Sequence, residues 1–393
     1  MHAFRGLRLA VLSLALPAVA LPPARAPRSV DAIKYARYPH ISNSGHIAFT
    51  YQDDIWVADG DGANPRRLTN NIARDINPRF SPDEKWIAFS SNRMGNYDVY
   101  VIPVGGGEAK QLTWHTADDN VLYWTPDGKE VVFTSSRSMH PFGSPLYKVD
   151  LEGHLPTPMP MDFARNGMIK QDNTLVAYNR NGPPYWRKGY RGNAAADIAV
   201  QDLRTGDIRE VSYTDIKKFR SQASDAQPMW GPDGKIYFAS ERDGIFNIWR
   251  FNADGTSPEQ VTHFKTGGIT FPAMSPDGKK MIFENEFDLW TLDLPGGSPK
   301  RLSIHIDAEP KENPVEFVNA DSRAEGFDVS PSGEYLTVDY HGEIFVVPAD
   351  AGFGEKIQVT NSPFRERSEL YSPDGKKIKY ISDETGDEEI WVY

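Results

Sequence analysis

The stretch Pro78–Val101, PRFSPDEKWIAFSSNRMGNYDVYV, contains one complete unit of a pattern that recurs along the chain. Its segment Ser81–Glu84 is typical of a type I turn, because proline at the second position has the φ that this turn requires. A strand is predicted at Lys85–Ser91, and a second turn surrounds Gly95. Together with the strands on either side, the unit is an antiparallel meander of about 40 residues, which predicts one blade of a β-propeller.

Two independent markers of this unit recur. The turn motif Ser/Thr/Gly-Pro-Asp/Ser-Gly/Glu begins at Ser81, Thr125, Gly231, Ser275, Ser330 and Ser372, with degenerate copies near Ser42 and Gln171. The third strand of the unit begins at Asp54, Asp98, Pro145, Asp197, Asn247, Asp288, Glu343 and Glu389. Both markers indicate eight repeats. Their inner strands contain apolar runs such as Ile87–Phe89, as expected for a sheet that is covered on both faces.

The spacing of the repeats predicts the domain organisation. The first six repeats occupy residues 31–303, and residues 304–325 form a charged stretch with two prolines that interrupts the spacing. Two further repeats follow in residues 326–393. We therefore expect an all-β protein: a six-bladed propeller of four-stranded antiparallel blades, a linker, and the first two blades of a second, truncated propeller.

Residues 1–26 are predicted to be a secretory signal peptide. Arg5 and Arg8 precede an apolar core, Leu9–Leu16, which is too short to cross a bilayer, and Ala18-Val19-Ala20 fits a cleavage site. The predicted location is periplasmic or secreted, with no membrane anchor after cleavage.

Composition and motifs argue against several classes of function. The 54 acidic and 43 basic residues give a net charge of −11, which does not favour nucleic acid as a partner. The chain has no cysteine, no Gly-x-Ser-x-Gly elbow and no His-Glu-x-x-His motif. His115 with Asp118 and Asp119 is interpreted as a solvated loop. No catalytic residue, metal or cofactor is expected, and the acid that begins most third strands is interpreted as structural.

The fourth repeat contains the one candidate binding segment. An insertion of more than ten residues, within NRNGPPYWRKGYRGNAAAD at Asn179–Asp197, alternates aromatic and cationic side chains. Such side chains suit stacking on a peptide and pairing with a carboxylate. The candidate substrate-binding residues are Tyr185, Trp186, Arg187, Lys188, Tyr190 and Arg191. The alternative is a long hairpin that folds over its own blade or a neighbouring domain.

The insertion Pro183–Gly192 and the six repeats followed by a second array resemble the N-terminal half of tricorn protease and its bacterial homologues. The resemblance implies a seven-bladed second propeller, followed by serine protease domains that trim oligopeptides. It also implies oligopeptide substrates, contact with those C-terminal domains, and a homo-oligomer. In that family an adjacent arginine pair in the first propeller anchors peptide carboxyl ends. The matching region here, Trp114–Leu122, has no arginine.

Three functions therefore remain open. The chain is either the substrate-handling, gating propeller part of a secreted tricorn-like serine protease, a TolB-like periplasmic interaction propeller, or the propeller of a prolyl-oligopeptidase-type enzyme. The break after six repeats disfavours the last of these. A TolB-type protein would carry a small α/β domain before its propeller, and only about ten residues separate the cleavage site from the first blade here.

The chain ends of the first array predict how its ring closes. The first repeat already contains four strands, and the sixth has its own outer strand at Lys300–Ser303. We therefore expect an open ring, held between the first and sixth blades by side-chain packing alone. The alternative is a latch in which residues 28–37 add a strand to the sixth blade.

Overall fold

The computed structural model describes residues 31–137, 144–161, 163–180, 189–190, 195–212, 224–308, 324–350 and 354–393. Backbone contacts divide the chain into two units, Met1–Lys311 and Glu312–Tyr393, and each unit is described by itself. Every regular element in the described ranges is a β-strand. These ranges contain no helix that is long and apolar enough to span a membrane.

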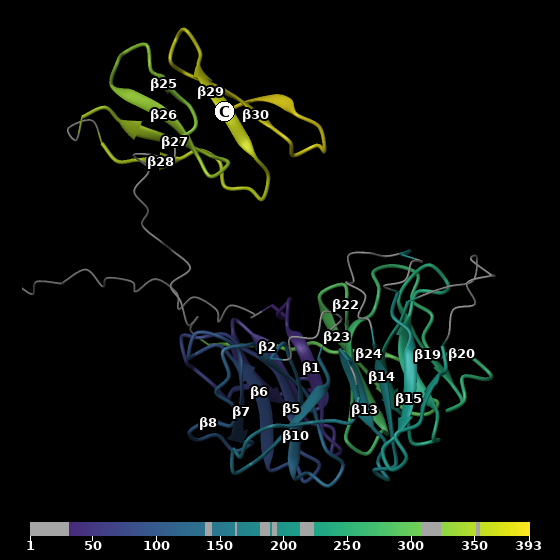
Figure 1. Ribbon diagram of the computed structural model, residues 1–393. Coiled ribbons are helices and arrows are strands. Elements are labelled where there is room, and N and C mark those ends of the chain that lie inside the picture. The colour runs from purple at the N-terminus through teal and green to yellow at the C-terminus, as the bar shows by residue number, and fades with distance from the viewer. Residues whose placement is uncertain are drawn as a thin grey trace, which may run out of the picture. The chain divides into compact units, whose positions relative to one another are not determined.

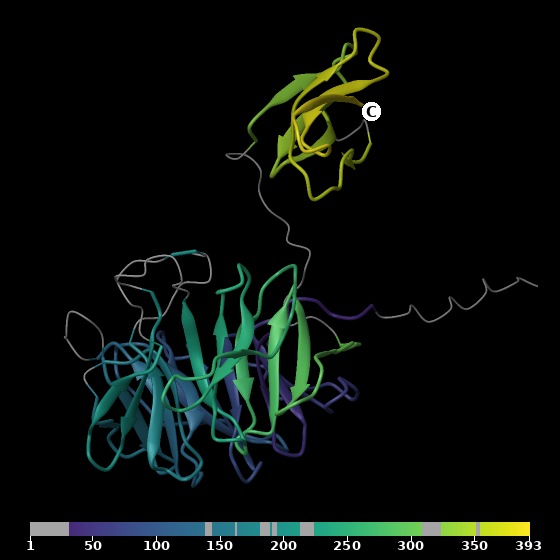
Figure 2. The ribbon, with the colours of Figure 1, turned by 90° about the vertical axis from the view of Figure 1, so that its right-hand side faces the viewer.

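Unit 1 contains six four-stranded antiparallel sheets, and in each sheet the strands follow one another in sequence order (Figures 1 and 2). The first three sheets are formed by β1 (Arg37–Ile41), β2 (Ile47–Tyr51), β3 (Asp54–Ala58), β4 (Arg66–Arg67), β5 (Asp75–Phe80), β6 (Trp86–Ser91), β7 (Asp98–Pro103), β8 (Lys110–Gln111), β9 (Asp119–Trp124), β10 (Glu130–Ser135), β11 (Leu146–Asp150) and β12 (Thr157–Pro158). The next three are formed by β13 (Asn166–Ile169), β14 (Leu175–Asn179), β15 (Ile198–Asp202), β16 (Ile208–Glu210), β17 (Asp225–Trp230), β18 (Ile236–Ser240), β19 (Asn247–Phe251), β20 (Glu259–Gln260), β21 (Thr270–Met274), β22 (Lys280–Asn285), β23 (Asp288–Asp293) and β24 (Lys300–Arg301).

The turn motif joins the first and second strands of each sheet through the hydrogen bonds that its residues allow. In the second sheet the Ser81 hydroxyl donates to Asp83 Oδ1 at 2.6 Å, and the Trp86 amide donates to Ser81 Oγ at 3.0 Å. The same serine–aspartate bond occurs between Ser275 and Asp277 at 2.7 Å. A local sequence thus determines the turn, since a short polar side chain replaces the missing backbone partner.

The acid that begins the third strand also has the structural role predicted for it. Asp98 Oδ1 accepts from the Thr113 hydroxyl at 3.2 Å, and Thr113 Oγ1 accepts from the Val99 amide at 2.9 Å. Glu343 and Thr360 make the equivalent bond in unit 2, at 2.7 Å. The acid therefore fixes the end of the fourth strand against the third, which confirms the structural interpretation.

The core of unit 1 consists of apolar clusters between neighbouring sheets. Phe80, Phe89 and Ile55 lie in the cluster between the first and second sheets, and a similar cluster lies at each of the following junctions. The last cluster joins the sixth sheet to the first, through residues such as Ile282 and Phe49. Both faces of each sheet are buried, as the apolar inner strands predict, and β1 lies beside β22 (Figure 1).

The ring is not closed by side chains alone, so that expectation is wrong. The Ile33 amide donates to the Ile304 carbonyl at 2.8 Å, and the Tyr35 amide donates to the Phe287 carbonyl at 3.2 Å. The segment that precedes β1 also adds no strand to the sheet of β21–β24. The junction instead contains individual backbone bonds, because residues 31–36 cross the edge of the sixth sheet without forming a ladder with it.

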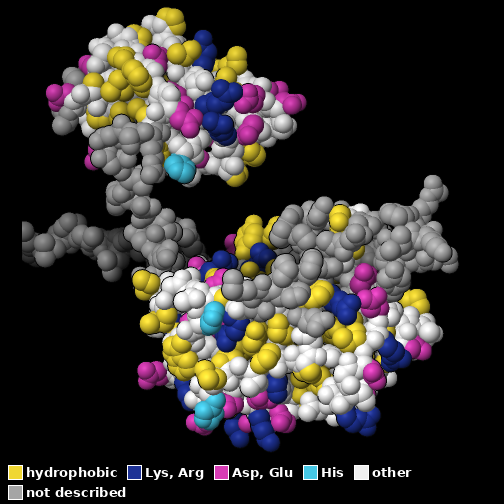
Figure 3. All heavy atoms as spheres, viewed as in Figure 1, with side chains coloured by type: hydrophobic (Ala, Val, Ile, Leu, Met, Phe, Trp, Pro, Cys, Tyr) yellow, Lys and Arg dark blue, Asp and Glu magenta, His cyan; other side chains and the backbone are white. Residues whose placement is uncertain are grey.

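Unit 2 contains one four-stranded sheet and one three-stranded sheet in its described part. These are formed by β25 (Phe327–Val329), β26 (Tyr335–Tyr340), β27 (Glu343–Pro348) and β28 (Ile357–Gln358), and by β29 (Glu366–Tyr371), β30 (Ile378–Ser382) and β31 (Glu389–Val392). Large apolar side chains are exposed on these strands, among them Phe327 at 72% and Ile390 at 75%. Figure 3 shows hydrophobic side chains gathered on one face of this unit.

Candidate functional site

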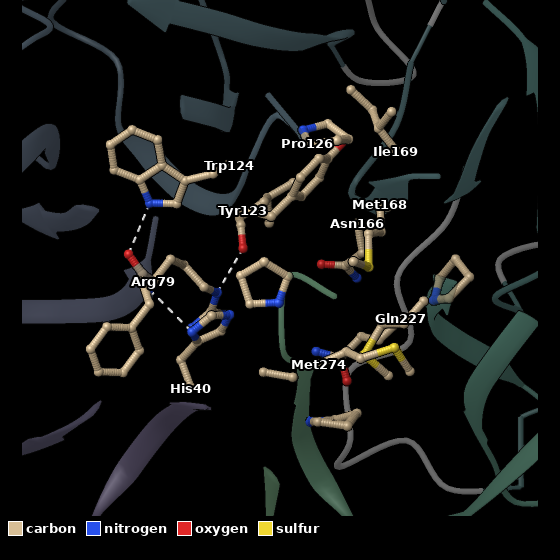
Figure 4. Close-up of a pocket in the computed structure, with 18 of the residues that line it drawn as sticks. His40, Arg79, Tyr123, Trp124, Pro126, Asn166, Met168, Ile169, Gln227 and Met274 are labelled. Atoms are coloured by element: carbon tan, nitrogen blue, oxygen red, sulfur yellow. Dashed lines mark hydrogen bonds between the residues drawn. The ribbon is translucent and has the colours of Figure 1, made fainter. Parts of the chain in front are cut away.

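The first strands of all six sheets in unit 1 line one central pocket with a volume of about 90 Å³ (Figure 4). Its polar side chains are His40 from β1, Arg79 from β5, Tyr123 from β9, Asn166 from β13 and Gln227 from β17. Because every sheet contributes its innermost strand, the pocket lies at the centre of the ring.

The register of the first strand shifts in five of the six sheets that line this pocket. In four of these shifts the bulged residue has a positive φ although it is not glycine. The four bulged residues, each followed by proline, are Tyr38, Asn77, Gln227 and Phe271. The α region is disfavoured before proline, and a bulge bends its strand and redirects the side chains that follow. His40 and Arg79 come directly after two of these prolines, and both face the pocket (Figure 4).

Arg79 places a positive charge in the wall of the pocket. Its Nε donates to the Leu122 carbonyl at 2.6 Å, and its Nη1 donates to the Pro78 carbonyl at 2.8 Å. Among the described residues no carboxylate forms an ion pair with it. Burial lowers the pKa of Arg79 to about 10, so the guanidinium stays protonated at neutral pH. The pocket wall therefore carries one cation that is balanced only by carbonyl dipoles.

His40 is neutral beside this cation. It is 5% exposed, and its Nδ1 accepts from the Phe80 amide at 3.1 Å (Figure 4). Burial and then the charge of Arg79 hold the pKa of His40 well below its ordinary value. Because Nδ1 is an acceptor, the proton of the neutral ring is on Nε2. His40 thus supports the backbone of the second sheet and adds no charge to the pocket.

Uncharged polar groups complete the wall. The hydroxyl oxygen of Tyr123 is buried and makes no hydrogen bond of ordinary geometry with the described residues. Burial raises the pKa of Tyr123, and the nearby Ile169 backbone opposes that shift, so the phenol keeps its proton. Asn166 and Gln227 lie across the pocket from His40 and Arg79 (Figure 4). Donors dominate this set, which suits carbonyl oxygens or a carboxylate.

The described lining of the pocket lacks the side chains of covalent catalysis. No serine, threonine or cysteine side chain is among its lining residues in the described ranges. The described residues also contain no group of three or more acids or histidines that could hold a metal ion. The wall can therefore orient a polar chain, but it offers no nucleophile for the acyl transfer of a serine protease.

The candidate binding residues predicted from the sequence lie apart from this pocket. Tyr185, Trp186, Arg187, Lys188 and Arg191 lie outside the described residues. Tyr190 is described and half-buried, and it does not line the pocket. The neighbouring Gly189 amide donates to Glu241 Oε2 at 2.8 Å, so the end of the insertion contacts the fifth sheet, just after β18.

The interpretation of one sequence cluster needs correction. Asp119 does not lie in a solvated loop: it begins β9, is fully buried and pairs with Arg137 at 2.6 Å. His115 is exposed, and its Nδ1 accepts from the Ala117 amide at 3.0 Å. The 18-residue separation between Asp119 and Arg137 also separates Asp75 and Arg93, which pair at 3.0 Å. This recurrence was a visible signal of a buried ion pair.

The sequence also contains a signal for the pocket that its analysis missed. In the first, second, fifth and sixth repeats, a proline stands three residues before the turn motif, at Pro39, Pro78, Pro228 and Pro272. Proline is disfavoured in the interior of a sheet except at bulges and edges. Its recurrence at one position therefore indicated the bulged, channel-lining strand.

Comparison with known proteins identifies the family. The model of the tricorn protease N-terminal β-propeller domain matches residues 33–298, which is more than half of the chain. The chain belongs to this family. The matched segment begins just before β1 and ends within the sixth sheet, so it covers all six first strands that line the pocket.

Relatives extend the likeness over most of the chain. The putative tricorn protease homolog 2 of Streptomyces coelicolor is 27% identical over 380 residues, covering 93% of this chain and 31% of that protein. A crystal structure of the tricorn protease superposes with a TM-score of 0.67 at 20% identity, covering 92% of this chain and 34% of that one. A TolB homolog of Chlorobium chlorochromatii is 27% identical over 206 residues, covering 51% of this chain and 40% of that protein. The chain thus spans about a third of the tricorn relatives.

Proposed function

We propose that this tricorn-type propeller handles and gates oligopeptides for a secreted serine protease whose catalytic groups lie outside the present chain. The observation that carries the proposal is the central pocket, in which six strands converge on Arg79 with donor groups around it. A peptide backbone offers carbonyl oxygens along its length and a carboxylate at one end, and both match these donors. The small volume of the pocket favours an extended chain over a folded one.

Other parts of the proposal come from the sequence and the family. The segment 1–26 would direct the protein out of the cytoplasm, to the periplasm or beyond. The partners proposed are oligopeptide substrates, the protease domains of the longer protein, and further copies in a homo-oligomer. The insertion that contains Tyr185–Arg191 is proposed as a second peptide contact, outside the pocket.

The test is binding of a fluorescein-labelled penta-alanine peptide to the purified chain, measured by fluorescence anisotropy. Asn166→Trp places a large ring at the pocket wall and should weaken binding at least tenfold. Arg165→Trp makes the same change at the exposed preceding residue, which does not line the pocket, and should leave affinity within twofold. Equal affinity of both variants, or no binding of the unchanged chain, would refute the pocket as the peptide site.

A protein-interaction role of the TolB kind is the second candidate. It is favoured by the TolB homologs that match about half of this chain. The larger coverage by tricorn relatives ranks it second. If the chain retained a folded protein from a periplasmic extract, and binding survived Asn166→Trp while the peptide did not bind, the TolB-like role would replace the first proposal.

A further inference from the structure

The junction between the sixth and first sheets differs in one respect from every other junction of unit 1. At the other five junctions the polypeptide runs directly from one sheet into the next. The sixth and first sheets are neighbours in the ring, but no connecting segment joins them, because β1 is the first strand of unit 1 in the sequence and β24 is the last. The ring can therefore widen at this junction without stretching a peptide connection between the two sheets.

The closing junction between the sixth and first sheets has the same kind of backbone hydrogen bond as the five junctions that the chain crosses directly, which we call the continuous junctions. At each junction a backbone amide of the incoming chain donates to a carbonyl in the hairpin between the second and third strands of the preceding sheet. The continuous pairs are Asp75–Asp53, Asp119–Tyr97, Ala164–Ser144, Asp225–Ala196 and Ile269–Phe246, at 2.7–2.9 Å. At the closing junction Tyr35 donates to Phe287 in the same hairpin, at 3.2 Å. Residues 31–37 therefore dock on the sixth sheet as an inter-sheet connection would.

A second bond of the junctions is also reproduced. The Val121 amide donates to Ser90 Oγ at 2.8 Å, and the Gln227 amide donates to Asn179 Oδ1 at 2.7 Å. In both cases a side chain of the preceding sheet's second strand receives an amide from the innermost strand of the next sheet. At the closing junction the Tyr38 amide donates to Glu284 Oε1 at 2.7 Å. The acceptor there is the carboxyl group of a glutamate in place of a hydroxyl or an amide.

Charged side chains and aromatic rings add further contacts at the closing junction. Lys34 pairs with Asp288 at 2.7 Å, and Arg37 Nε lies 2.8 Å from Glu284 Oε2. The Tyr35 ring packs on Phe287 with centroids 4.8 Å apart, and the Arg37 guanidinium lies 5.1 Å from the centre of the Phe271 ring. The Lys34 side chain is 45% exposed and Tyr35 is 61% exposed, so these contacts can separate without opening the core.

We propose that residues 31–37 are a releasable clasp that closes the ring at its noncovalent junction and limits the rate at which peptide enters the central pocket. The rate statement rests on the proposed peptide-handling function, whereas the closure statement does not. Release of the clasp frees the start of β1 from the sixth sheet beside the pocket, to whose wall β1 and β21 supply His40 and Met274. The ligand in this proposal is an extended oligopeptide, which binds and leaves without any covalent step.

The test uses the full chain with the double substitution Lys34→Ala/Tyr35→Ala. Both side chains are exposed enough for the fold to tolerate their loss. Hydrogen exchange of the Ile33 amide, which donates to Ile304, should accelerate at least tenfold. Association of fluorescein-labelled penta-alanine, followed by stopped-flow anisotropy, should accelerate at least threefold with little change in affinity.

Arg74→Ala is the matched control, because it removes an exposed pair of the same kind, Arg74–Asp53 at 3.1 Å, at a continuous junction. It should change neither rate. Unchanged Ile33 exchange in the double variant would overturn the clasp. Faster exchange with an unchanged association rate would overturn its control of entry. If the unchanged chain binds no peptide, the proposed function fails, and the exchange measurement alone decides whether the clasp closes the ring.

Discussion

The two units contain the same repeat, but their buried acids have different partners. In unit 1, Asp119 at the start of β9 is fully buried and pairs with Arg137 at 2.6 Å. In unit 2, Glu366 begins β29 and is 3% exposed, but among the described residues its Oε1 accepts from hydroxyls alone, those of Ser362 and Ser382. The position 18 residues after Glu366 is Glu384, where the second and third repeats of unit 1 have Arg93 and Arg137.

A second acid strengthens the contrast. Glu369 in β29 is 2% exposed, and neither carboxylate oxygen has a hydrogen-bond partner among the described residues. Burial, together with the charge of Asp339, raises the pKa of Glu369. A buried charge is tolerated when it is paired, and otherwise destabilises the fold or takes up a proton. The repeat therefore specifies the strands, whereas its charge partners decide how stable each blade is.

Removing a cation from a buried pair should give the largest effect. Arg137→Met leaves Asp119 buried without a cation and should destabilise unit 1 by about 3–5 kcal/mol. Urea unfolding followed by tryptophan fluorescence measures this, because Trp391 is the one tryptophan of unit 2 among the nine in the chain.

The matching variant in unit 2 is Arg365→Met, which removes a pair with Glu325 whose side chains are 60% and 68% exposed. An exposed pair of this kind contributes about 0–1 kcal/mol. A loss of similar size in the two variants would mean that burial does not distinguish the units.

The pH dependence of the stability of unit 1 tests another of its buried acids, Glu284. Burial raises the pKa of Glu284 to about 7, against the opposing charge of Arg37. The folded state then holds a proton that the unfolded state has lost, so this group's contribution falls as pH rises from about 4.5 to 7. Relative to Glu284→Gln, the wild type should lose on the order of 3 kcal/mol across that window. Urea unfolding of both proteins at several pH values measures the difference, and parallel curves would contradict it.

Glu369, the buried acid in β29 of unit 2, should also make the free energy of unfolding fall as pH rises, by a smaller amount. Glu369→Gln removes a carboxyl that is costly to ionise and should stabilise unit 2 by about 1–2 kcal/mol at pH 7, with little effect at pH 4. The ¹⁹F NMR signal of Trp391 in 5-fluorotryptophan-labelled protein reports unfolding of this unit. Glu388→Gln, at an exposed position of the same unit, is the control. Destabilisation by Glu369→Gln at pH 7 would show that this carboxylate has a cationic partner.

The smallest change in stability is expected at the apolar surface of unit 2. Phe327→Ser and Ile390→Ser alter side chains that are 72% and 75% exposed, so the free energy of unfolding should change little. Self-association should nevertheless decrease, because exposed apolar patches promote it. Sedimentation velocity measures the association. The same substitution at the fully buried Phe89 in unit 1 should instead prevent folding.

The sequence by itself determined the repeat, because turns and strands depend on neighbouring residues. Ser81-Pro82-Asp83 forms its turn with bonds inside a few positions, and apolar runs such as Ile87–Phe89 indicate a sheet covered on both faces. The family resemblance was likewise visible in these repeats. The insertion around Tyr185 was the candidate site for the same reason, since its composition is locally unusual.

Only the tertiary structure decided the pocket and the closure of the ring. His40, Arg79, Asn166 and Gln227 are far apart in sequence, and they meet because each lies on the innermost strand of a different sheet. Tyr35 reaches Phe287 across some 250 residues only when six sheets have completed a circle. Such contacts form only because the rotations from each sheet to the next add up to a full circle. A short stretch of sequence does not determine that total.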